Sequence, residues 1–184
     1  MKKLALLLSM LLCLVPTLAS CGANSSPEKA VTAVIEATYE DFDYEVFNKV
    51  CYSLNVDLYE DVLEGDDLKA AKENIRSTQD VIKETFKEMK KEAEKCEKFK
   101  LEYDIRYCEI YDEKDDEFDE IIKRNSDIND TDFEDLTDKV AKVRVVGEVF
   151  VTDEDGEDDI VEIDETFTCF HIDGNWYVVE LFTK

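Results

Sequence analysis

The spacing of the apolar residues changes once along the chain, and this change constrains the fold more than any other feature. Up to about Glu97 the apolar residues recur every three or four positions, which predicts amphipathic helices. From Phe99 onward they alternate with polar residues, which predicts strands with one buried face. Helices followed by strands predict an α+β domain, with N-terminal helices packed on a mainly antiparallel, four-stranded sheet.

The helical part begins with a clear start signal. Ser26 is a preferred N-cap residue, and Pro27 is favoured at the first position of a helix. The spacing predicts three helices, which run from 27 to about 39, around 46–51, and from 68 to about 97. The stretch 54–63 favours neither helix nor strand, and the long helix has a candidate bend at 77–80.

Strands are predicted in the second half at about 99–107, 141–151, 160–172 and 175–182. A change of phase at Cys108 and Ile110 indicates a β-bulge in the first strand, and Asp173-Gly174 is typical of a two-residue hairpin turn. Residues 112–138 form an acidic insertion between the first two strands. A small helix, a capping box at Thr131–Glu134 and a solvated charged face are expected within it.

The N-terminus has the pattern of an export signal. Lys2 and Lys3 precede the apolar run 4–15, which is too short to span a bilayer. The following Leu-Ala-Ser-Cys sequence at 18–21 resembles the bacterial lipobox, which implies lipid attachment at Cys21. We therefore expect a signal peptide at 1–20, a lipidated Cys21 with a short tether at 21–26, and a single domain at 27–184. An ordinary signal peptide with an incidental cysteine is the alternative.

The charge of the chain limits its partners. The 184 residues carry a formal net charge of −25 at pH 7, which argues against binding to nucleic acid. The expected partners are the membrane, through the lipid anchor alone, and either an envelope protein or a small-molecule ligand. We predict no cofactor and no specific metal site.

Four cysteines remain after the predicted anchor, and they leave the redox state open. Cys51, Cys96, Cys108 and Cys169 permit three disulfide pairings, but free buried thiols are equally ordinary. None of them forms a C-x-x-C pair or a closely spaced zinc motif, so neither redox nor zinc chemistry is expected.

Three short segments carry a resemblance to a known family. They are Ser26-Pro27-Glu28-Lys29-Ala30-Val31, the acidic break Asp41-Phe42-Asp43, and Asp173-Gly174-Asn175-Trp176-Tyr177-Val178-Val179. Together with the element order over about 26–184, they resemble bacterial lipoproteins with a nuclear transport factor 2-like (cystatin-like cone) domain. The resemblance implies a curved sheet wrapped around a long helix. The resulting cone can be an active site, a ligand pocket or a simple core.

Enzymes of this fold, such as the SnoaL-like cyclases and ketosteroid isomerases, use acidic or histidine residues inside the cone. The corresponding candidates here are His171, Glu165 and Glu180. Strand pairing across the hairpin predicts His171 opposite Trp176 and Phe167 opposite Glu180. His171 and Glu165 would then lie about 20 Å apart on one strand, beyond hydrogen-bond reach. We therefore predict no catalytic residues.

Aromatic residues could line a ligand pocket in the cone. The candidates are Tyr103, Phe167 and Trp176, together with Glu180 as a lone buried carboxylate. A further set shares the same strands: Tyr107, Phe170 and Tyr177. Aromatic residues at strand spacing more often belong to a core than to a pocket.

A calcium loop is the other candidate site. Asp153, Asp155, Gly156 and Glu162 occupy positions 3, 5, 6 and 12 of an EF-hand frame, but position 1 is Val151. Strands are predicted on both sides of the loop, which favours a solvated acidic hairpin turn instead. The sequence thus predicts a lipid-anchored, extracytoplasmic binding or interaction domain without catalysis. The alternatives are a cone-pocket enzyme and a cation-binding acidic surface domain.

Overall fold

A computed structural model describes residues 22, 24–60, 63–129 and 133–180. The predicted signal peptide, Cys21 and Thr131 lie outside these residues. Within the described ranges, no helix combines the length and apolar character needed to cross a bilayer.

The helical half contains α2 (Pro27–Tyr39), α3 (Tyr44–Val50), a 3-10 turn (Tyr52–Leu54), α4 (Val56–Glu60) and α5 (Gly65–Ala93). The predicted start signal is confirmed, because the Ser26 hydroxyl accepts a hydrogen bond from the Lys29 amide at 3.3 Å. The stretch 54–63, which favoured neither helix nor strand, contains the end of the 3-10 turn and α4, and its residues 61–62 lie outside the described part. The long helix α5 continues through 77–80 without a break in the helix.

The second half forms one antiparallel sheet in the order β1-β2-β3-β4. Its strands are β1 (Lys98–Asp112), β2 (Lys139–Thr152), β3 (Asp158–Ile172) and β4 (Asn175–Glu180). A register shift between Ile105 and Tyr107 confirms the bulge that the phase change indicated. Asp173 and Gly174 both have positive φ values, 50° and 79°, as a type I′ hairpin turn requires. The α+β prediction is confirmed.

One predicted strand pairing is wrong. His171 pairs with Trp176, as expected, and Cys169 pairs with Val178. The register then shifts between Thr168 and Cys169, so that Glu180 pairs with Thr168 and not with Phe167. A bulge inserts one residue into one strand, and side chains beyond it change face relative to a regular ladder.

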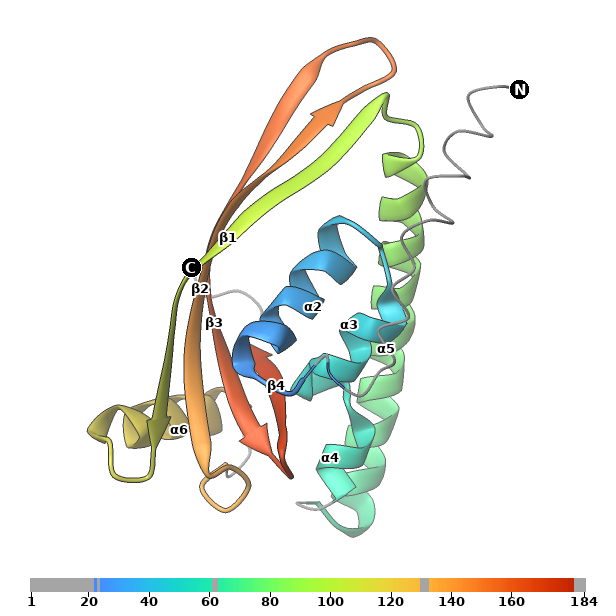
Figure 1. The fold of residues 1–184 in the computed structure, drawn as a ribbon. Helices are drawn as coiled ribbons and strands as arrows, with labels where there is room; N and C mark the ends of the chain where they lie inside the picture. The colour runs from blue at the N-terminus through green and yellow to red at the C-terminus, as the bar shows by residue number, and fades with distance from the viewer. Residues whose placement is uncertain (1–21, 23, 61–62, 130–132, 181–184) are drawn as a thin grey trace.

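Three of the N-terminal helices, α2, α3 and α5, cover one face of the sheet in two layers (Figure 1). α2 lies directly against the sheet, and its buried Val31 and Val34 belong to the same cluster as Val143 of β2 and Phe167 of β3. The long helix α5 packs on α3, where the rings of Phe47 and Phe86 lie 5.0 Å apart. The helix inside the curve of the sheet is therefore α2, whereas the resemblance implied a long one.

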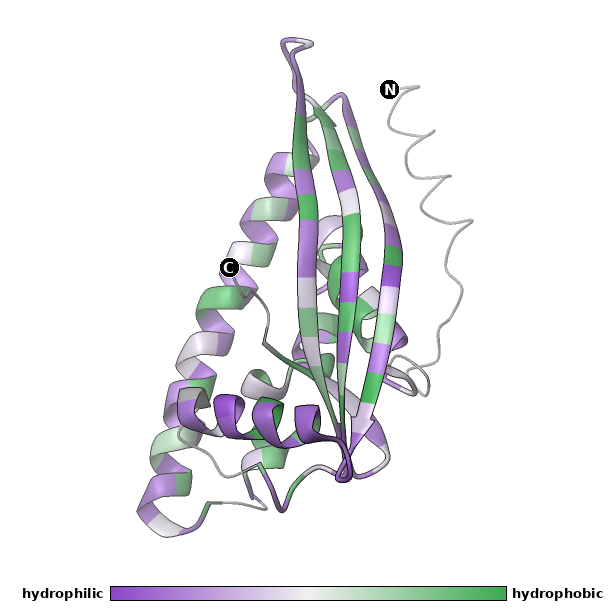
Figure 2. Cartoon of the chain, turned by 90° about the vertical axis from the view of Figure 1, so that its left-hand side faces the viewer, coloured by the Kyte–Doolittle hydropathy of each residue, from purple (hydrophilic) through white to green (hydrophobic). Residues whose placement is uncertain are grey.

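The acidic insertion builds a second core on the opposite face. Its helix α6 (Asp116–Asn129) lies across the lower end of the sheet in Figure 2. The apolar side of α6 is buried with residues of the sheet and the 3-10 turn, in a cluster that includes Phe118, Ile121, Ile122, Phe133, Phe170 and Tyr52. The charged run 112–120, expected to be a solvated face, is exposed except at the half-buried Glu117 and at Phe118, which is buried on the apolar side of the expected small helix.

Beyond α2 and α6, three strands continue as an arm (Figure 1). We define the distal arm as residues 98–104 of β1, 146–152 of β2 and 158–164 of β3. Hydrophilic and hydrophobic residues alternate along its strands, and none of the described helices lies over its face away from α2 (Figure 2).

Candidate functional site

Of the predicted pocket residues, Tyr103, Phe167 and Trp176 belong to the core beneath α2. Phe170 and Tyr177 belong to the second core on the opposite face, and Tyr107 is 37% exposed. Phe167 and Trp176 are 2% and 6% exposed and are part of the core between α2 and the sheet. Tyr103 packs against the same core, and its hydroxyl donates a hydrogen bond to the Glu36 carboxylate of α2 at 3.0 Å. Burial, with this carboxylate beside it, raises the pKa of Tyr103 to about 12. The side chain of Glu180 lies outside the described part.

The two candidate catalytic residues with described side chains, His171 and Glu165, are not brought together. His171 and Glu165 both belong to β3, six residues apart, or about 20 Å along an extended strand. Glu165 faces the helices near Tyr39, where its charge contributes to the raised pKa of the tyrosine after burial itself. His171 stacks on Trp176, with ring centroids 5.0 Å apart, at the hairpin end of the sheet.

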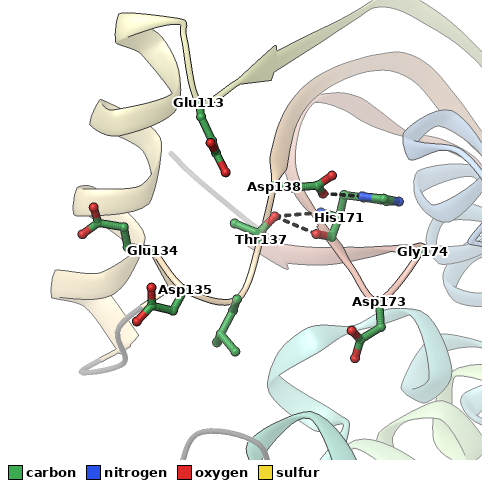
Figure 3. Close-up of a pocket in the computed structure, with 9 residues that line it drawn as sticks. Glu113, Glu134, Asp135, Thr137, Asp138, His171, Asp173 and Gly174 are labelled. Atoms are coloured by element: carbon green, nitrogen blue, oxygen red, sulfur yellow. Dashed lines mark hydrogen bonds and ion pairs between the residues drawn. The ribbon is translucent and has the colours of Figure 1, made fainter.

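The structure instead places His171 at the edge of a hollow that the sequence did not indicate (Figure 3). The hollow has a volume of about 460 Å³ and adjoins a second of about 270 Å³ between β3 and the 3-10 turn. Neither is lined by Tyr103, Phe167 or Trp176. Acidic side chains dominate the lining of the larger hollow: Glu113, Glu134, Asp135, Asp138 and Asp173.

Asp138 orients the imidazole of His171. The Nδ1 atom of His171 lies 2.5 Å from Oδ1 of Asp138, and Figure 3 shows this contact at the edge of the hollow. Hydrogen bonding to His171 holds the pKa of Asp138 below its usual range. Sequence reasoning missed Asp138 as the partner of His171. The pairing of β2 with β3 could have indicated it, because Lys139 lies opposite His171 and Asp138 immediately precedes Lys139.

The hydroxyl of Thr137, which also lines the hollow, is already hydrogen-bonded to backbone groups. Thr137 is 4% exposed, and its Oγ1 accepts from the His171 amide at 3.1 Å. The same hydroxyl donates toward two carbonyl oxygens, that of Lys139 at 2.7 Å and that of His171 at 2.8 Å. Thr137 therefore ties the start of β2 to the end of β3. The hollow offers negative potential and one oriented imidazole, without an available hydroxyl nucleophile in its described lining.

The residues that match the EF-hand spacing do not form one calcium-binding loop. Asp153 and Gly156 belong to the β2–β3 turn, where the Asp153 carboxylate accepts from the amides of Asp155 and Glu157 at 2.9 Å each. Glu162 lies within β3, opposite Glu148 of β2. Among the residues with described side chains, no group of three potential ligands is arranged to hold a metal ion.

The four cysteines of the described residues, Cys51, Cys96, Cys108 and Cys169, are free thiols. Cys51 and Cys169 are fully buried, and Cys96 and Cys108 are half-buried. Burial raises the pKa of Cys169 well above its usual value, and the neighbouring Cys108 and Cys51 act in the same direction. These thiols have the environment of core residues.

Comparison with known proteins does not assign the chain to a family. No protein-family model matches it, and no curated protein matches it. A solved structure with some likeness is the crystal structure of the intermembrane space region of chloroplast protein ARC6. That chain is 12% identical, and the alignment covers 82% of this chain and 92% of that one with a TM-score of 0.28. A TM-score this low does not define a common fold.

Proposed function

We propose that this protein is a lipid-anchored, extracytoplasmic domain that binds another protein through its surface and does not catalyse a reaction. Within this proposal, the domain is a member of the nuclear transport factor 2-like group whose cone serves as a core. Cys21 would hold the domain at the outer side of the bacterial cell membrane.

The observation that carries the proposal is the filled interior of the sheet's curve. Phe167, Trp176 and Val143 are buried there beneath α2, and the Tyr103 hydroxyl donates a hydrogen bond to the Glu36 carboxylate. Ligand sites are concave, with a few convergent polar groups. The candidate polar groups His171 and Glu165 do not converge, which favours recognition on the outside of the domain.

The anchor is tested by the mass of the mature N-terminal peptide after expression in a bacterium. We expect a peptide that begins at Cys21 and carries acyl chains, and a protein that enters the detergent phase of a Triton X-114 extract. Cys21→Ser should lose both properties, whereas Cys13→Ser, inside the signal segment, should retain them. An unmodified Cys21 in the wild type would contradict the anchor.

The alternative is a cone-pocket enzyme of the SnoaL-like or isomerase type, which requires an open cavity beneath α2. Xenon enters apolar cavities that are large enough to hold it. Diffraction from crystals pressurised with xenon should therefore show no xenon between α2 and the sheet. A xenon atom beside Phe167 or Trp176 would reject the filled interior and favour the enzyme.

A further inference from the structure

The sheet has an open edge on the distal arm. β4 pairs with β3 only from Thr168 to Ile172. The segment Asp158–Ile163, which we call the open edge, is paired with β2 on one side and has no described strand on the other. An edge strand presents backbone donors and acceptors that can pair with another chain.

The other edges are protected differently. Along β4, Val178 forms a bridge with Cys51, and the Trp176 amide donates to the Asn24 carbonyl at 2.8 Å. Along β1, charges of both signs are paired with each other, Lys100 with Glu102 and Arg106 with Asp104. Charged residues on an edge discourage pairing with a strand that does not complement them. The mixed signs on β1 favour no particular charge on a partner.

The backbone of the open edge has an amide that β2 does not use. The Ile160 amide donates to the carboxylate of the adjacent Asp159 at 2.9 Å. Because strand amides point alternately to the two sides, the amide of Glu162 faces the same way as that of Ile160. The local hydrogen bond from Ile160 can be exchanged for one to the carbonyl of an added strand.

Apolar side chains flank this amide on both faces of the strand. Ile160 is 52% exposed and Val161 is 48% exposed. Ile160 pairs with Phe150 and Val161 with Val149, so the two exposed side chains lie on opposite faces of the sheet. An added strand would place its own alternating side chains beside them.

The charge at the open edge has one sign. The segment contains Asp158, Asp159 and Glu162 and no basic residue. Glu162 lies opposite Glu148, which lies opposite Glu102, so three carboxylates form a row across the outer face. Like charges placed directly opposite each other are destabilising in a sheet. Cationic side chains from a partner would relieve this repulsion.

We propose that the open edge binds an extended segment of a partner protein as an additional strand, and that this segment carries lysine or arginine alternating with apolar residues. A second copy of the chain is disfavoured, because pairing two open edges would bring the same carboxylates together in a protein of net charge −25. This inference rests on the proposed function and specifies its surface and partner.

The first test removes the edge amide. The full-length protein in neutral detergent micelles is titrated into a fluorescein-labelled ten-residue peptide of alternating lysine and valine, with fluorescence anisotropy as the readout. Ile160→Pro should raise Kd about tenfold, because one intermolecular hydrogen bond is lost and a peptide carbonyl loses its donor. Ile160→Thr retains the amide and should change Kd less than about threefold. Equal Kd values for both variants would overturn strand addition.

The second test compares the removal of two carboxylates from the open edge with the removal of two carboxylates from β1. Asp159→Asn with Glu162→Gln should weaken peptide binding and reduce its salt dependence. Asp104→Asn with Glu109→Gln, which removes two carboxylates from β1 outside that row, should weaken binding much less. Equal weakening by the two pairs would show general attraction to an acidic surface and would overturn the site.

Absence of any binding by the wild type would also overturn this inference. The lipid on Cys21 and the xenon experiment would be unaffected by that result, so the proposed function would stand or fall separately. An identically prepared peptide of alternating glutamate and valine should not bind, and binding as tight as that of the lysine peptide would reject the charge argument.

Discussion

Gly147 of β2 lies directly opposite Tyr103 of β1, and the two are so close that a side chain does not fit at position 147. A Cβ atom there would lie 2.7 Å from Cβ of Tyr103 and 2.4 Å from the carbonyl oxygen of Glu102. Tyr103 is in turn held to Glu36 of α2 by a 3.0 Å hydrogen bond. This contact joins the base of the distal arm to the helical layer.

Gly147→Ala should destabilise the protein by about 1–3 kcal/mol, because the added methyl group forces β1 and β2 apart. Urea unfolding followed by circular dichroism measures the change. The neighbouring exposed residue provides the control, since Glu148→Ala should change the free energy of unfolding by less than about 0.5 kcal/mol. Equal effects of the two substitutions would show that the close approach is not important for stability.

The contact between Asp138 and His171 should make stability depend on acid pH. The pKa of Asp138 is lowered in the folded state, so its contribution is present above the unfolded value of about 4 and is lost as pH falls through the folded-state pKa. Asp138→Asn should therefore lose less free energy of unfolding than the wild type between pH 5 and pH 3.

Asp173→Asn is the matched control for this pH dependence. Asp173 lines the same hollow, and asparagine also tolerates its positive φ of 50°. Its pH profile, measured by urea unfolding at each pH, should follow that of the wild type. A profile of Asp138→Asn that matches the wild type would reject the stabilising role of the contact.

The second core should contribute strongly to stability. Phe133 is fully buried, and its ring packs edge-on against Tyr52 at 5.0 Å and Phe170 at 4.9 Å. Phe133→Ala should destabilise the domain by about 3–5 kcal/mol, as expected for a large cavity. Glu120→Ala, on the exposed side of α6, should have almost no effect on the melting temperature. A small effect of Phe133→Ala would mean that the insertion is not part of the cooperative fold.

The cysteines should differ in reactivity. Burial raises the pKa of Cys51 and Cys169, and burial beside Glu28 raises the pKa of Cys108 to about 12. Because the thiolate is the reactive form, iodoacetamide at pH 8 should label Cys96 before these three. Peptide mass spectrometry after timed labelling reports the order. Cys51 and Cys169 should react in urea without prior reduction, and a requirement for reductant would reveal a disulfide.

Local patterns in the sequence were sufficient to predict most of the elements, although not the 3-10 turn and α4. The Ser26 cap, the Asp173-Gly174 turn and the phase change around Cys108 each depend on residues within a few positions of one another. For this reason the helices, the strands and the bulge in β1 lie close to where the patterns place them. The α+β architecture follows from their order along the chain.

Only the tertiary structure decided what those elements bring together. Asp138 and His171 are 33 residues apart and meet only when β2 pairs with β3. The bulge at Thr168 moves Glu180 away from Phe167, and the apolar side of α6 covers the face opposite α2. Periodicity specifies that an amphipathic element has an apolar side, but which surface it covers depends on contacts between distant residues. The sequence alone therefore determined the elements, and long-range packing decided the filled interior, the acidic hollow and the open edge.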